Sequence, residues 1–269
     1  MISALTRCEN GLCGTANGSW PQAGLPCTVG YSSPATRSPR LPTTDCLLPE
    51  HEVLIDLHNH TWPRSHDSVL NPDDLVVRAK KAGLDAICFT EHDTLWDAKS
   101  VADICERHNF LVMAGVEIGT DDGHILTFGI DKYVFGMHRS NELAGHVEAH
   151  DGAMVAAHPY RRQMPWYIRD EEEYQRSLQK ASENPAYRFV CGMEELNGRG
   201  SEKENAFSRR LCDLMGMPGT AGTDSHSIQD VGKCATYFER IINDERDLIR
   251  ELLAGRFYAV DLRCNAILR

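Results

Sequence analysis

The stretch "VLIDLHNHTWPRSHDS", residues 53–68, joins an apolar run to several side chains of the kinds that bind metal ions. The run "VLIDL" is typical of a buried strand, and His58, His60, His66 and Asp67 follow it closely. Alternate residues of a strand point to the same side, so the H-x-H pair directs His58 and His60 toward one point. A histidine at a strand end is also common as an ordinary hydrogen-bonded polar group. The stretch therefore raises two hypotheses, a cation site and a plain strand end.

From this strand onward the chain alternates between strand-like and helix-like segments. Asn71 as the cap, Pro72 at the first helical position and Gly83 as the stop frame the first helix. Such alternation favours an α/β fold with parallel strands, and about seven units favour a closed or nearly closed barrel over an open sheet. We expect strands at residues 53–60, 85–93, 110–119, 124–130, 153–159, 188–197, 218–226 and 256–260, and helices at 71–83, 95–109, 141–152, 169–184, 202–216 and 244–255.

Polar side chains recur where these strands end, or in one case begin. In a (β/α) barrel the loops that follow the strands meet at one rim, so such side chains converge there. Imidazole and carboxylate groups suit zinc, manganese or iron, and two or three such ions together hold a phosphate and activate water. The repeated position favours a shared cation site, although "TDSH" taken alone also fits a turn or a helix cap. The strand-end residues are His58, His60, Glu91, His92, Glu117, His124, His158, Asp224 and His226.

The first 50 residues differ in composition from the rest. They are rich in Gly, Pro, Ser and Thr and hold half of the chain's 12 prolines, which predicts a disordered or loosely attached extension before a folded domain at residues 51–269. The start of the chain lacks the apolar core of a secretory signal, and no run is long enough to span a membrane. Together with 10 cysteines in no disulfide pattern, this predicts a cytoplasmic protein with reduced thiols.

The net charge of −11 disfavours a broad, sequence-independent grip on duplex nucleic acid, which needs clustered Lys and Arg. It is compatible with a small phosphorylated substrate, because bound divalent metal ions reverse the charge locally. No Gly-rich nucleotide-binding loop is present, so no nucleotide cofactor is expected. The sequence leaves the oligomeric state open.

The ordered series "DLHNHT", "SHDS", "TEHD", "GVEI", "GHILTFG", "AHPYR", "EELNGR" and "AGTDSH" resembles the PHP (polymerase and histidinol phosphatase) domain family over about residues 53–262. The resemblance implies a metal-dependent phosphoesterase on a distorted (β/α)7 TIM-like barrel with a di- or trinuclear site. Position by position, it implies a first metal ion bound by His58, His60, Glu117 and Asp224, a second bound by Glu117, His124 and His158, and a third bound by Asp67, His92 and His226. His66 stays an alternative to Asp67.

The same resemblance implies hydrolysis of a small phosphate mono- or diester by a hydroxide activated by Mn, Zn or Fe ions. Arg161, Arg162 and Arg199 lie in the expected rim loops, where they either hold phosphate oxygens or are simple surface charge, and Glu195 and Asn197 would orient other groups. One alternative is an amidohydrolase-type metallohydrolase, which usually carries a bridging lysine on the fourth strand, where "HILTFGI" has none. Another is a non-catalytic, metal-binding regulatory module, against which the complete set of ligands counts.

Overall fold

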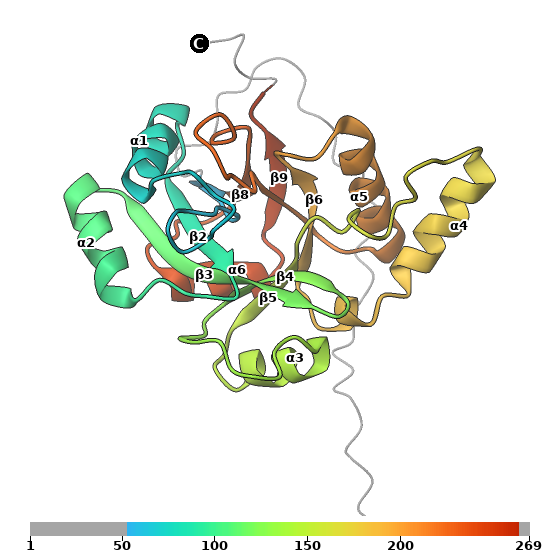
Figure 1. Cartoon of the computed structure of the whole chain (residues 1–269), viewed down its shortest axis with the longest axis horizontal. Coiled ribbons are helices and arrows are strands. Elements are labelled where there is room, and N and C mark those ends of the chain that lie inside the picture. Colours follow the sequence, from blue (N-terminus) through green and yellow to red (C-terminus); the bar gives the residue numbers. More distant parts are fainter. Residues whose placement is uncertain (1–52, 264–269) are drawn as a thin grey trace, which may run out of the picture. The chain divides into compact units, whose positions relative to one another are not determined.

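A computed structural model describes residues 53–263 of the chain. The expected extension at residues 1–50 lies outside the described residues, so its structure stays a prediction. Residues 53–263 form nine β-strands and six α-helices, with one 3₁₀ turn (Figure 1). The strands are β1 (Val53–Asp56), β2 (Ala86–His92), β3 (Leu111–Thr120), β4 (Gly123–Phe128), β5 (Ala153–Ala156), β6 (Gly192–Asn197), β7 (Gly219–Gly222), β8 (Cys234–Phe238) and β9 (Phe257–Asp261). The helices are α1 (Pro72–Ala82), α2 (Ala98–His108), α3 (Ser140–Glu148), α4 (Glu171–Ser182), α5 (Glu202–Met215) and α6 (Glu245–Leu253). None of these helices is long and apolar enough to cross a membrane.

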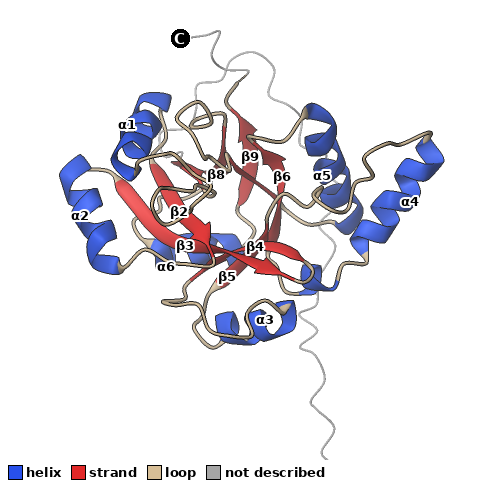
Figure 2. Cartoon of the chain, viewed as in Figure 1, coloured by secondary structure: helices blue, strands red, loops and turns tan. Residues whose placement is uncertain are grey.

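The strands form one curved sheet in the order β7-β6-β5-β4-β3-β2-β1-β8-β9 (Figure 2). β1, β2 and β3 are parallel, and so are β5, β6 and β7, as expected. β4 is the exception among these strands, because it runs antiparallel to both β3 and β5. Only Asp121 and Asp122 separate β3 from β4, and so short a link makes a hairpin, whereas parallel neighbours need a long crossover.

The expected strand list also omitted β8. This strand pairs antiparallel with β1 on one side and with β9 on the other, which distorts the barrel at the amino ends of the parallel strands. At their carboxyl ends the chain after β7 reaches the chain after β1 directly. The Asp224 amide donates to the His58 carbonyl at 2.8 Å, and the His60 amide donates to the Ser225 carbonyl at 3.0 Å. The sheet is therefore nearly closed, and the expected distorted barrel is confirmed.

A buried polar network lies along the seam, which is the junction between the carboxyl ends of β1 and β7. The Asp56 carboxylate accepts hydrogen bonds from the amides of His58 (3.2 Å) and Thr223 (2.9 Å) and from the Thr223 hydroxyl (2.5 Å). The Asn59 Oδ1 atom accepts from the Ser225 hydroxyl at 2.7 Å. Burial raises the pKa of Asp56 to about 6. The three hydrogen bonds oppose this shift, because they offset part of the free-energy cost of removing the carboxylate from water. The network holds the two strand ends in register.

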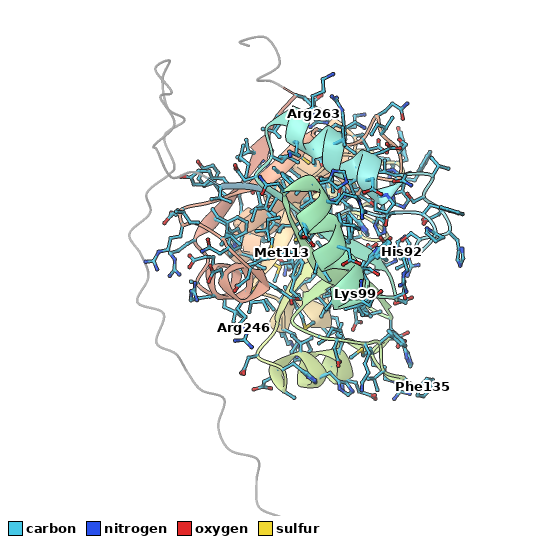
Figure 3. The ribbon with its side chains drawn as sticks, turned by 90° about the vertical axis from the view of Figure 1, so that its left-hand side faces the viewer. His92, Lys99, Met113, Phe135, Arg246 and Arg263 are labelled. Carbon is cyan, nitrogen blue, oxygen red and sulfur yellow. The ribbon has the colours of Figure 1, made fainter. Side chains whose placement is uncertain are left out.

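Helices cover the outside of the sheet, and α1 shows how the sequence specifies them. The Asn71 side chain accepts from the Asp73 amide, Pro72 begins the helix, and Gly83 ends it at a φ of 83°, as expected. The buried face of α1 packs against Ile87 and Phe89 of β2. In the side view of Figure 3, His92 at the end of β2 and Arg246 in α6 lie at opposite sides, so the carboxyl ends of the parallel strands point away from α6.

Candidate metal centre

Glu117, at the carboxyl end of β3, lies at the centre of a cluster of histidines. Its Oε1 atom lies 2.8 Å from His124 Nδ1 and 2.8 Å from His158 Nε2. Its Oε2 atom lies within 3.3 Å of three more ring nitrogens, those of His58, His60 and His92. Strands that are far apart in the sequence thus bring five imidazoles around one fully buried carboxylate.

Hydrogen bonds to the outer ring nitrogens determine which way the lone pairs of His58 and His60 point. His58 Nδ1 lies 2.7 Å from Glu194 Oε1, which only accepts, so this nitrogen carries the proton and Nε2 is left with the lone pair. His60 Nδ1 lies 3.2 Å from the Ser65 hydroxyl, whose own proton goes to Glu91 at 2.5 Å. His60 therefore donates to Ser65, and its Nε2 atom also has a lone pair.

These two lone pairs face one another and the Glu117 carboxylate. The Nε2 atoms of His58 and His60 are 3.0 Å apart. Glu117 Oε2 is buried and accepts no hydrogen bond of acceptable geometry within the described part of the chain, although three ring nitrogens lie close. Burial opposes a charge on His58, yet the carboxylates of Glu194, Glu117 and Asp224 outweigh it and raise the pKa of His58 well above its usual value. The centre therefore requires a cation, either a proton or a metal ion, and the mixture of imidazole and carboxylate fits a transition metal.

Asp224, just after β7, closes the inner side of the cluster. Its Oδ1 atom lies 3.4 Å from His60 Nε2 and 3.7 Å from His58 Nε2. Its Oδ2 atom accepts from the Arg161 guanidinium at 2.5 Å, and the same guanidinium lies 3.0 Å from His158 Nε2. Burial opposes ionisation, but the charges of His58 and Arg161 and a bond to His60 keep the pKa of Asp224 far below its usual value. Arg161 therefore contacts the cluster directly.

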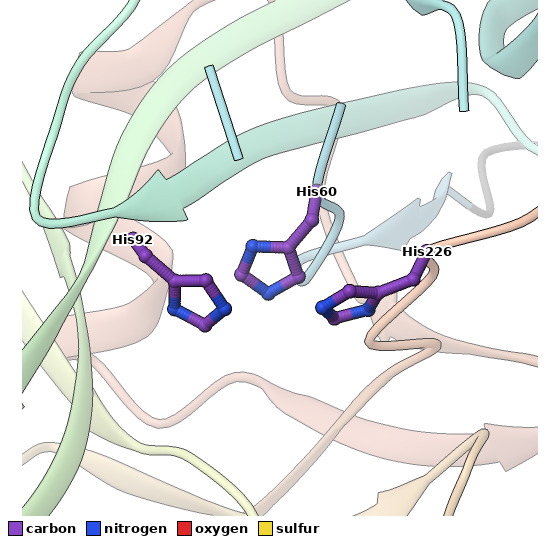
Figure 4. Close-up of side chains that lie close together, drawn as sticks. All are labelled: His60, His92 and His226. Carbon is purple, nitrogen blue, oxygen red and sulfur yellow. The ribbon is translucent and has the colours of Figure 1, made fainter. Parts of the chain in front are cut away.

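Asp67, His92 and His226 form the outer side of the cluster. The Asp67 Oδ2 atom lies 3.2 Å from His92 Nε2 and 3.0 Å from His226 Nε2. The rings of His92 and His226 flank His60, with centroids 4.2 and 4.4 Å from it (Figure 4). Asp67 is the residue in contact with these rings, and the neighbouring His66 is exposed. All nine expected side chains therefore lie in one cluster at the barrel mouth.

The two remaining arginines lie farther out. Arg199 Nη1 is 2.7 Å from His226 Nδ1, so its guanidinium borders the outer side of the cluster. Arg162 is exposed and adopts a left-handed φ of 61°. It lines a cavity beside the cluster, and among the described residues it makes no hydrogen bond or ion pair with any of the nine side chains, which sets it apart from its neighbour Arg161.

The sequence interpretation missed Glu194 and chose its neighbour Glu195. The Glu194 carboxylate accepts from His58 Nδ1, from the His158 amide at 2.7 Å and from Asn197 Nδ2 at 3.2 Å. Glu195 instead faces Arg209 at 3.8 Å. The pairing of β6 with β7 shifts register between Glu194 and Leu196, which is a β-bulge. Because the bulge breaks the two-residue alternation, Glu194 and Asn197 both face inward, and the paired glutamates "EE" were the only signal in the sequence.

Glu91 is close to the cluster without contacting the nine side chains. It accepts from the Thr61 amide at 2.8 Å, from the Thr61 hydroxyl, from the Ser65 hydroxyl and from Trp96 Nε1 at 2.8 Å. Four donors satisfy this fully buried carboxylate, so it has no lone pair left to bind a metal ion. Its place in the structure fixes Ser65, and through Ser65 the orientation of the His60 ring.

A cavity of about 630 Å³ opens beside the cluster. His124, His158 and Arg161 form its inner border, and the segment after β5 and the start of α5 form its outer wall. A bound molecule in this cavity would touch the cluster through these two histidines.

Comparison with protein families agrees with this geometry. A sequence model described as "PHP domain" matches residues 56–197, and one described as "PHP-associated" matches residues 202–257. A protein called "Probable phosphatase" of Caldicellulosiruptor bescii is 25% identical over 206 residues, which cover 67% of this chain and 82% of that protein. A protein called "Probable histidinol-phosphatase" of Thermotoga maritima is 30% identical over 97 residues, which cover 33% of this chain and 41% of that protein. The chain also matches an error-prone DNA polymerase of Cutibacterium acnes, but the match covers only 6% of the polymerase.

Two solved structures share the fold. PsfC from Pseudomonas syringae superposes with a TM-score of 0.53 at 18% identity, covering 78% of this chain and 92% of that chain. An amidohydrolase from Chromobacterium violaceum superposes with a TM-score of 0.50 at 17% identity, covering 77% of this chain and 98% of that chain. At such identities the likeness concerns the barrel alone, since one fold carries many activities.

Proposed function

The chain belongs to the PHP domain family, and from that premise we propose that it is a metal-dependent phosphoesterase acting on a small phosphate mono- or diester. The observation that carries the proposal is the convergence of two imidazole lone pairs on a buried carboxylate oxygen that accepts no hydrogen bond. Such an arrangement binds a cation, and divalent ions in turn attract phosphate oxygens. The names of the two phosphatase relatives support the same class of reaction.

We assign the nine side chains to two or three divalent metal ions, with Mn, Zn or Fe as the expected elements. Glu117 presents one oxygen to each of two groups of histidines, which suits a carboxylate that bridges two ions. The first group is His58, His60 and Asp224, the second is His124 and His158, and the third is Asp67, His92 and His226. The ligand atoms of His58, His158 and Asp224, and those of His60, His92 and His226, also lie within 4.8 Å of one another, so the three groups are contiguous.

When bound, the ions would supply Lewis acidity toward a phosphate and lower the pKa of a water molecule. The protein supplies the orientation. Glu194 holds the His58 ring and the His158 backbone, so both imidazoles keep their direction without cost during the reaction. Arg161 lies between Asp224 and His158 and has further N–H groups for phosphate oxygens, and Arg199 borders His226.

We also propose that the protein is cytoplasmic and that residues 1–50 form an extension that the reaction does not need. The five cysteines within residues 53–263 are all free thiols, which agrees with a reducing compartment. Activity that is unchanged after removal of residues 1–50 would support the second statement.

The test is metal analysis of the purified full-length chain, combined with a panel of phosphate esters and a matched panel of amides and lactones. We expect bound Mn, Zn or Fe, and release of phosphate that stops with a chelator and returns with the metal ion. Hydrolysis of amides or lactones in place of phosphate esters would favour the amidohydrolase alternative. A metal-loaded protein without turnover on either panel would favour a regulatory module.

A further inference from the structure

The cavity beside the metal centre is lined by cationic and acidic side chains that form no ion pairs with one another among the described residues. Three of its lining side chains are cationic, namely Arg161, Arg162 and Lys203, and two are acidic, Asp122 and Glu204. Arg161 is held by Asp224 and His158 at the inner border. The two outer cations, Arg162 and Lys203, have no hydrogen bond or ion pair to another side chain among residues 53–263.

Both acidic side chains of the wall are engaged elsewhere. The Asp122 carboxylate accepts from the Ser140 hydroxyl, which ties it to the start of α3. The Glu204 carboxylate accepts from the Ser201 amide at 2.8 Å and from the Ser201 hydroxyl at 2.7 Å, which completes the capping box of α5. Neither carboxylate is therefore committed to Arg162 or Lys203.

Each of the two outer cations also occupies a position that is locally unfavourable. Lys203 is the second residue of α5, where the positive end of the helix dipole disfavours a cation. Arg162 has a φ of 61°, a left-handed conformation that favours glycine over a long side chain. Backbone strain of this kind is kept where another requirement outweighs it. One cation is kept despite backbone strain and the other despite the helix dipole, and both line the same cavity, which points to a shared requirement for positive charge.

The outer wall also has an apolar stretch. Met164, Pro165 and the fully exposed Trp166 line the cavity, together with the polar side chains of Gln163 and Ser201. The apolar stretch suits a carbon chain or ring in the leaving group.

We propose that this cavity holds the leaving group of the substrate, and that this leaving group carries a second anionic group bound by Arg162 and Lys203. The proposal rests on the phosphoesterase function proposed above. The substrate class is then a phosphate ester of an alcohol with an apolar spacer and a second phosphate, sulfate or carboxylate. An alcohol that bears an amine is disfavoured, because its cation would face Arg162 and Lys203.

The test compares matched esters on the manganese-loaded full-length protein. The probes are 3-hydroxypropyl phosphate, 3-aminopropyl phosphate and propane-1,3-diyl bisphosphate, with the hexane-1,6-diyl bisphosphate as a longer spacer. We expect kcat/KM to be about tenfold higher for one of the bisphosphates than for the hydroxyl compound, and lowest for the amine.

Two variants link this preference to the two cations. Arg162→Gly and Lys203→Glu should each lower the ratio of bisphosphate to hydroxyl-compound kcat/KM by about fivefold. Both should keep or raise the Tm, since the first relieves the left-handed strain and the second suits the helix dipole. Lys132→Glu, on an exposed loop residue outside the cavity, makes the same change in net charge as Lys203→Glu and should leave the ratio as it is.

The outcomes separate the two proposals. Hydrolysis of all probes with no preference for a bisphosphate, or a preference that both variants retain, overturns the inference and leaves the phosphoesterase function standing. No phosphate release from any probe or from the wider ester panel overturns the function, and the inference falls with it.

Discussion

The inner and outer sides of the metal centre differ in how firmly the protein holds their side chains. His58, His60, Glu117 and Asp224 have side chains that are 0–1% exposed, whereas Asp67 is 55% and His92 is 33% exposed. Each inner imidazole also has its second nitrogen fixed, His58 by Glu194 and His60 by Ser65. The protein itself therefore holds the inner donors in place, whereas the outer donors lie on exposed side chains with fewer contacts. We therefore expect tight binding of metal inside and weaker binding outside.

The largest effect should come from removing an inner ligand. His58→Ala or Asp224→Ala should lower turnover by about 10³-fold or more, because the remaining donors no longer enclose an ion. Turnover and metal content, together with circular dichroism to show that the fold is intact, would measure this. Unchanged activity in either variant would contradict the proposed site.

The next effect concerns the support of the inner side. Glu194→Gln should weaken metal binding by about 10- to 100-fold, since the amide no longer gives His58 and His158 a charged acceptor. Glu195→Gln is the matched control one residue away, and its side chain faces Arg209 on the outer side of β6. Isothermal titration with Mn²⁺ would compare them. An equal loss of Mn²⁺ affinity in both variants would show that Glu194 is not the side chain that supports His58 and His158.

The pH dependence tests the inner side in another way. The pKa of His58 is raised in the folded, metal-free protein, so its protonation stabilises that state below pH 6.5, and this stabilisation is lost as the pH rises through the raised pKa. A metal ion must displace that proton, so metal affinity should fall about tenfold per pH unit on acidification below the raised pKa. Thermal melts with chelator should therefore lose stability above pH 6.5, and melts with metal should not. Parallel pH profiles for the two forms would contradict the assignment of a displaceable proton.

The smallest effect should come from the outer side. Asp67→Ala removes an exposed carboxylate, so turnover should fall by about fivefold and the inner ion should stay bound. His66→Ala next to it should have no effect, because that side chain is exposed and Asp67 makes the contacts to His92 and His226. A larger loss in the His66 variant would exchange the two roles.

Local signals in the sequence predicted much of the fold. The first helix was predicted with its caps, because Asn71, Pro72 and Gly83 act through their own backbone geometry. The convergence of His58, Glu117 and Asp224 was predictable from barrel geometry, which brings strand ends together whatever their separation in the chain.

The errors arose where neighbouring strands decide the outcome. β8 has no alternation of polar and apolar residues, and all five of its residues are buried, so its sequence carries no period. The bulge in β6 depends on its pairing with β7, so the inward direction of Glu194 could not be read from β6 alone. The antiparallel direction of β4, by contrast, follows from the short Asp121–Asp122 link, which is visible in the sequence.

The seam described above runs through the middle of the metal centre. His58 and His60 follow β1, whereas Asp224 and His226 follow β7, and hydrogen bonds between the two chain segments hold these pairs side by side. An ion coordinated by both pairs would link the two chain segments across the seam and so hold the barrel closed. Spontaneous opening of the seam, which exposes the buried amides of Asp224 and His60 to hydrogen exchange, would release the ion, so the loaded protein should exchange these amides far more slowly than the empty one.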